Sequence, residues 1–132
     1  MNKQIIDNEI EFAYKAIRDC KICNEEGEIP KNYRGQVSSF GAAILMGSLL
    51  QAVAFFSKQG NSSSERPKIL NAVFEVMKKN NNAIRQDHLF HYVKAEREKG
   101  SAAGMACQEE VLNAAIAVKL AMNLYKMVDN DK

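Results

Sequence analysis

Paired cysteines and paired histidines are the side chains whose spacing could do chemistry in this sequence. Cys20 and Cys23 form a C-x-x-C pair, and His88 and His91 form an H-x-x-H pair. Together they offer the four sulfur and nitrogen ligands of a tetrahedral zinc site. Zinc fingers usually place about three to five residues between their histidines, and no strand hairpin is predicted around these cysteines. The spacing therefore favours a core position for Cys20 and a frayed helix end for Cys23.

The two histidines are also candidates for general acid–base catalysis, because an imidazole titrates near neutral pH. Such a site needs a lysine, a tyrosine or a carboxylate positioned beside the imidazoles. Tyr92 and Lys94 are close in sequence, but on a helix they would largely face other directions. We therefore interpret His88 and His91 as ordinary surface histidines.

Carboxylates cluster at two places without the spacing of a metal site. Glu25, Glu26 and Glu28 surround a glycine but do not follow the pattern of a calcium loop. Glu109 and Glu110 are expected in the first turn of a helix, where the helix dipole explains them. The sequence also lacks a phosphate-binding glycine loop and a nucleophile elbow. We therefore predict a protein that is not an enzyme, with no catalytic residue, no metal and no cofactor.

A basic stretch in the middle of the chain is the clearest signal of a binding function. Residues 1–30 hold four basic and seven acidic side chains, whereas residues 31–86 hold eight basic and two acidic ones. The alternative interpretation is an ordinary solvated surface. Cations of this kind contact phosphates regardless of base sequence and in a salt-dependent way. Tyr33 is the one obvious aromatic side chain available for base stacking. The candidate RNA-binding residues are Lys31, Arg34, Lys58, Arg66, Lys68, Lys78, Lys79 and Arg85.

The elements that must position these cations are all predicted to be helices, because apolar residues recur at alternating three- and four-residue steps. No segment alternates convincingly enough for a strand, and residues 24–30 are expected to be a linker. Ser63 or Ser64 is expected to cap one helix and Asp87 another. The helix over 48–58 is apolar almost all round, so it should be central to the core. The predicted helices cover residues 3–22, 31–45, 48–58, 65–79, 87–99 and 105–128.

Length and composition predict that residues 1–132 form one all-α domain, a single compact bundle of about five to six helices. Three cysteines, an odd number, argue against a disulfide framework. The start of the chain lacks the apolar region of a secretory signal. The apolar run 42–56 would span about 22 Å as a helix, which is short for a membrane crossing. We therefore expect a cytoplasmic protein without a membrane partner.

The segment 33–58 reads YRGQVSSFGAAILMGSLLQAVAFFSK. It resembles, without gaps, the signature of the small α-helical subunit of the type III-B CRISPR effector, the Cmr complex. That signature opens on Tyr, continues with Leu-Pro and an apolar stretch, and closes on Asn-Gly-Leu-Gly-Gln-Ala-Leu-Ala-Phe with a Ser-Lys-like end. Tyr33 matches the opening Tyr and Leu49 matches the Leu. Residues 51–55 match the closing run, and Lys58 matches the final Lys. The similarity is strong over about a fifth of the chain.

The segment departs from the signature at two places. Gly41 stands where Pro is usual, and Gly47 and Ser48 stand where Asn-Gly is usual. The break between the two helices is expected to survive, because a glycine is still present near it. The end of the chain matches the family more loosely, at Glu110 and Lys126.

The resemblance implies a non-catalytic subunit that takes part in antiviral defence. Its copies stack into a short filament beside a larger backbone subunit, and the groove between the filaments holds the guide and target RNA. Carried over to this chain, the basic residues of 31–86 face the target strand, and Lys58 occupies the lysine of the motif. From charge alone, the acidic first helix is expected to meet the next copy. The implied partners are the other Cmr subunits, further copies of this chain, and guide and target RNA.

Two other hypotheses are compatible with the same residues. A helical adaptor unrelated to CRISPR would show a large apolar patch without a coherent basic face. A zinc-dependent protein would use Cys20, Cys23, His88 and His91 and would carry stoichiometric metal.

Overall fold

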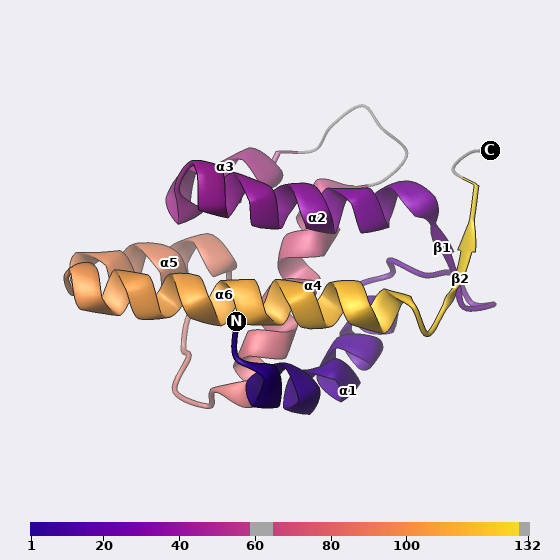
Figure 1. The fold of residues 1–132 in the computed structure, drawn as a ribbon, viewed down its shortest axis with the longest axis horizontal. Coiled ribbons are helices and arrows are strands. Elements are labelled where there is room, and N and C mark those ends of the chain that lie inside the picture. The colour runs from indigo at the N-terminus through magenta and orange to yellow at the C-terminus, as the bar shows by residue number, and fades with distance from the viewer. Residues whose placement is uncertain (59–64, 130–132) are drawn as a thin grey trace.

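The computed structural model of this protein describes residues 1–58 and 65–129. Those residues fold into a bundle of six helices with one pair of very short strands (Figure 1). This confirms the all-α class and the expected number of helices. The helices are α1 (Lys3–Asp19), α2 (Lys31–Met46), α3 (Leu49–Phe56), α4 (Arg66–Asn80), α5 (Leu89–Glu98) and α6 (Ser101–Met122).

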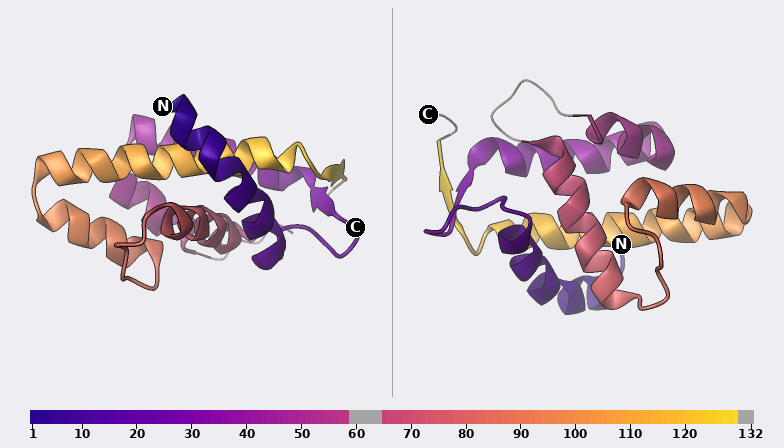
Figure 2. Two further views of the ribbon diagram at one scale, coloured as in Figure 1. Left: turned by 90° about the horizontal axis from the view of Figure 1, so that it is seen from below. Right: turned by 180° about the vertical axis from the view of Figure 1, so that it is seen from behind.

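Helix α6 is the centre of the bundle. It packs against α1, α2, α4 and α5, and α4 crosses behind it (Figures 1 and 2). The prediction that the helix over 48–58 is central was wrong. Helix α3 buries Leu49, Ala52, Val53 and Phe56, which follow the i, i+3, i+4, i+7 pattern of a single face. The other face of α3 is open to solvent, and Phe55 on that face is 61% exposed.

The two strands correct the prediction of a purely helical chain. β1 (Glu28–Pro30) lies in the predicted linker, and β2 (Lys126–Val128) lies inside the predicted last helix. They pair in parallel, with Ile29 opposite Met127. Gly27, at φ +78°, turns the chain so that its carbonyl accepts a hydrogen bond from the backbone N–H of Lys126 at 3.0 Å. Three residues are too few to show alternation, so the local pattern carries no strand signal.

Most helix ends lie close to the predicted residues. The break between α2 and α3 falls at Gly47, as expected, and Ser48 caps α3 by accepting a hydrogen bond from the backbone N–H of Gln51 at 3.1 Å. The prediction that Asp87 caps α5 was wrong, because the residue at the N-cap position is His88, one residue further along the chain. Helix α6 begins at Ser101, four residues before the predicted start. The predicted caps at Ser63 and Ser64 lie outside the described residues.

Glu9 is a buried acid in the contact between α1 and its neighbours. Glu9 is only 1% exposed, although a charged side chain is usually found on the polar face of an amphipathic helix. Glu9 follows the buried Ile6 by three residues and precedes the buried Ala13 by four, so it occupies the inner face. Burial, reinforced by the negative charge of Glu110 and opposed by a hydrogen bond from Asn80, raises the pKa of Glu9 to about 7.

This pKa predicts a pH dependence of stability that Glu9→Gln should remove. The folded protein binds the proton of Glu9 more tightly than the unfolded chain, whose value is 4.5. The stabilising contribution is therefore complete below about pH 4.5 and is lost as pH rises through about 7. We compare the free energy of unfolding of Glu9→Gln with that of the wild type. This difference should be up to roughly 3 kcal/mol more in favour of the variant at pH 8 than at pH 4.5.

Urea unfolding of both proteins between pH 4.5 and pH 8 measures this difference. Glu11→Gln, an exposed position on the same helix, is the matched control and should change little across the range. A pH profile of Glu9→Gln parallel to that of the wild type would show that Glu9 titrates normally.

Candidate nucleic-acid interface

The N-terminal ends of α2 and α4 meet at Tyr33. Its hydroxyl accepts a hydrogen bond from the backbone N–H of Glu65 at 3.0 Å, which satisfies a donor at the start of α4. The Tyr33 side chain is 3% exposed. The expectation that Tyr33 is available for base stacking was therefore wrong, because its ring lies in the core. Tyr33 instead holds together the starts of α2 and α4, which carry four of the eight candidate RNA-binding cations, and a fifth, Lys58, follows α3 at the same end.

Two of these cations are paired with acids. Lys31 Nζ lies 3.1 Å from Asp129 Oδ1, and Lys68 Nζ lies 3.3 Å from Glu65 Oε2. Lys68 also donates to the carbonyl of Lys21 at 3.2 Å. Exposed pairs of this kind contribute about 0–1 kcal/mol, so a phosphate can compete for either ammonium.

The other three cations at this end form no ion pair with an acid in the part of the chain that the structure describes. Arg34 donates to the side-chain carbonyl of Asn123, just after α6. The Arg66 guanidinium lies over the ring of Phe55, 4.7 Å from its centroid. Lys58 follows α3 and is exposed, and its backbone N–H donates to the carbonyl of Phe55 at 3.4 Å. These three positive charges are therefore available to an anionic partner.

The remaining three predicted cations lie at the opposite end of α4. Lys78 follows Lys68 by ten residues, or roughly 15 Å along the helix. Lys78 pairs with Glu75 at 3.3 Å and lies over the ring of Phe74, whereas Lys79 is exposed. Arg85 lies in the following loop and donates to the carbonyl of Asn82 at 2.6 Å. The eight cations therefore form two separate groups rather than one patch.

We name these groups by the end of α4 at which they lie. The α4 N-terminal group consists of Lys31, Arg34, Lys58, Arg66 and Lys68. The α4 C-terminal group consists of Lys78, Lys79 and Arg85.

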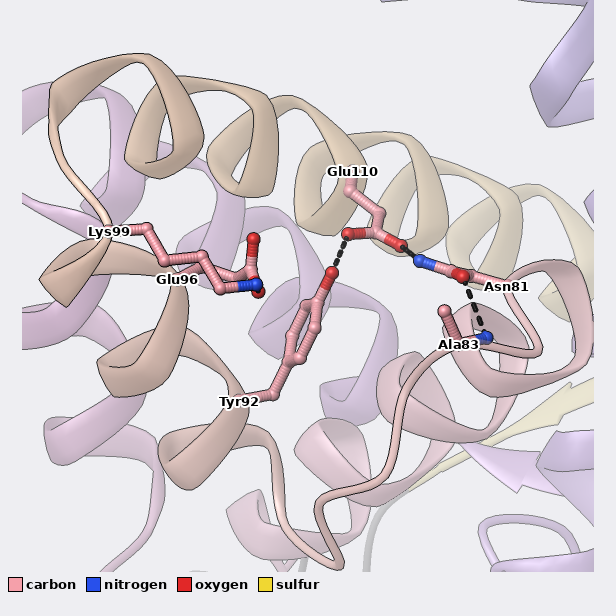
Figure 3. Close-up of polar contacts among 6 residues, drawn as sticks. All are labelled: Asn81, Ala83, Tyr92, Glu96, Lys99 and Glu110. Carbon is pink, nitrogen blue, oxygen red and sulfur yellow. Dashed lines mark hydrogen bonds and ion pairs between the residues drawn. The ribbon is translucent and has the colours of Figure 1, made fainter.

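Glu110 on α6 fixes the loop that carries Arg85 (Figure 3). One carboxylate oxygen accepts a hydrogen bond from the Tyr92 hydroxyl at 2.6 Å, and the other accepts one from the Asn81 amide at 3.1 Å. The Asn81 carbonyl oxygen in turn accepts the backbone N–H of Ala83 at 3.0 Å. Burial, together with the bond to Glu110, raises the pKa of Tyr92 above its usual value. The hydroxyl thus stays protonated and keeps donating to the carboxylate.

Tyr92→Phe should destabilise the protein by about 1.5–3 kcal/mol, because it removes a hydrogen bond to a charged group in a half-buried network. Denaturant unfolding at pH 7 measures this loss. Tyr14→Phe, at a more exposed ring, is the matched control and should cost less. Equal losses for the two variants would contradict a special role for the bond to Glu110.

The predicted zinc ligands are not assembled into a site. The described residues contain no group of three or more histidines, cysteines, aspartates or glutamates that could hold a metal ion. His88 and His91 lie together at the start of α5, with ring centroids 6.0 Å apart. Cys20 is partly buried beside α4, and burial raises the pKa of its thiol to about 11. This thiol is therefore protonated at neutral pH and is a poor nucleophile.

Phe55 is the residue at this surface that the sequence-based prediction did not include. The buried positions of α3 follow one face of the helix, and this spacing alone leaves Phe55 on the other face.

None of the described helices is both long and apolar enough to cross a membrane.

Comparison with known proteins assigns the family. The model of the family described as CRISPR-associated protein (Cas_Cmr5) matches residues 6–122, which is most of the chain. The chain belongs to this family. No curated protein and no solved structure matches the chain significantly. The match confirms the resemblance to the small subunit of the type III-B Cmr effector. It also removes the hypothesis of an adaptor unrelated to CRISPR.

Proposed function

We propose that this protein is a non-catalytic subunit of a type III-B Cmr effector that stacks with copies of itself and contacts guide and target RNA in antiviral defence. The observation that carries the proposal is the family match over residues 6–122. The open cations of the α4 N-terminal group support the RNA contact. Arg34, Lys58 and Arg66 form no ion pair among the described residues, so they can meet phosphates without first breaking one.

Two features of the polar side chains support a non-catalytic role. Glu110 is occupied by hydrogen bonds that hold α5 and the α4–α5 loop to α6. Burial raises the pKa of Cys107 to about 12, so its thiol is held in the unreactive protonated form. These groups, which could otherwise act in acid–base or nucleophilic chemistry, serve packing instead.

An apolar surface at the far end of the molecule from β1 and β2 supports the stacking of copies or docking of other Cmr subunits. Leu45, Met46 and Met105 are 69%, 88% and 73% exposed. Met105 lies in a groove that continues onto Leu49 and Leu50 at the start of α3. Exposed apolar side chains gathered around a groove are typical of a protein contact.

The proposed RNA contact predicts that cations of the α4 N-terminal group contribute to RNA affinity and to its salt dependence. The double substitution Arg34→Ala with Lys58→Ala should weaken binding of the full-length protein to RNA. Removing one phosphate-binding cation should reduce the slope of log affinity against log salt by about 1. Lys94→Ala, an exposed cation of α5 paired with Glu98, is the control and should leave affinity and slope unchanged. Fluorescence anisotropy at several salt concentrations measures both quantities.

The parallel pair Lys79→Ala with Arg85→Ala tests the second group in the same way. If neither double variant changes the salt slope, RNA does not contact either group.

Membership of the complex is tested separately by capture from the native host. Guide RNA with the larger Cmr subunits should co-purify, and a protein that emerges alone would contradict the proposal.

A further inference from the structure

Phe55 presents an aromatic ring at the surface beside two cations. Arg66 covers the ring at 4.7 Å from its centroid, yet the Phe55 side chain remains 61% exposed. Lys58 is bound through its backbone to Phe55 at the end of α3. An aromatic ring with a guanidinium over it and a further ammonium nearby combines stacking with positive charge. This combination is typical of proteins that hold single-stranded nucleic acid.

A groove lies beside this ring, between α3, α4 and α5. Ala54 and Pro67, the chain neighbours of Phe55 and Arg66, both line it. Its volume is about 580 Å³, within the range of sites that hold small organic groups. The apolar part of its lining is provided by Leu70, Leu89 and Phe90, and its polar part by Asn71, His88 and His91.

The charge of the groove favours an anionic occupant over an apolar peptide. Its lining contains no aspartate or glutamate among the described residues, and the adjacent Lys58 and Arg66 are both cations. Two acids neighbour these residues in the chain, and neither is part of the lining. Asp87 is exposed next to His88, and Glu65, next to Arg66, is paired with Lys68. Asn71 offers amide donors and acceptors and the two imidazoles offer ring nitrogens, which are the groups that read the edges of unpaired bases.

We propose that Phe55, backed by Arg66, stacks an unpaired RNA base at the mouth of the α3–α4–α5 groove. Lys58 and Arg66 neutralise the adjoining phosphates, and the groove holds the neighbouring nucleotide. This inference rests on the proposed RNA contact and adds a stacking site to it. It also gives His88 and His91 a place in base recognition rather than in metal binding or catalysis.

The test separates stacking from phosphate binding. The full-length protein is titrated against a single-stranded RNA of about twelve nucleotides and against a ribose-phosphate chain of the same length without bases. Phe55→Leu keeps an apolar side chain but removes the ring. It should weaken binding to the RNA roughly 5- to 150-fold, leave binding to the abasic chain unchanged, and keep the salt slope of the wild type. Phe55→Trp should retain the affinity for RNA.

Leu120→Ala, an exposed apolar residue of α6 to which no binding role is assigned, is the control and should bind both chains like the wild type. If Phe55→Leu binds RNA as well as the wild type while Lys58→Ala still weakens it, the stacking site is wrong and the proposed RNA contact stands. If the wild type binds neither chain, both are wrong. If Phe55→Leu keeps its RNA affinity but no longer enters the effector complex, Phe55 belongs to a protein interface and the inference is overturned.

Discussion

The close packing of helices around α6 is the constraint on which the other features depend. Ala114, Ala115, Ala117 and Ala121 are almost fully buried on successive turns of this helix. Because alanine extends no further than Cβ, the backbones of neighbouring helices can approach α6 from several sides. Alanine also has the highest helix propensity, so the same residues stabilise the helical conformation of this 22-residue segment. The α4 N-terminal and C-terminal groups of cations owe their separation to α4 lying straight across this core.

The helices were predictable from the sequence because their signal is local. Ile69, Val73 and Met77 on α4, for example, share one face at the spacing of a helix and are all buried. The strand pair was not predictable, because its partners lie about a hundred residues apart and each strand has only three residues. The burial of Glu9 could have been found from its spacing to Ile6 and Ala13. Residue type alone places a charged side chain on the polar face, whereas the position of Glu9 in the helix places it inside.

The candidate interface was predicted in part. The charge count located the cations, but composition cannot show which of them share a surface. The length of α4 decides this, since it places Arg66 and Lys78 at opposite ends of one rigid element. Tyr33 is buried and Phe55 is exposed because helical phase, and not residue type, decides which ring faces the core. A hydroxyl that can satisfy a helix terminus adds a further reason for Tyr33 to lie inside.

The parallel pairing of β1 with β2, and the packing of α1 on α6, join the first quarter of the chain to its last quarter. During synthesis α1 emerges before α6, so the part of its apolar face that packs on α6 stays uncovered until residues 101–122 have been made. Contacts between such distant segments also slow folding, because a long loop must close before they form. The newly made chain therefore exposes that part of α1 while the helices between them are being made, and α4 can cover only the rest of its inner face.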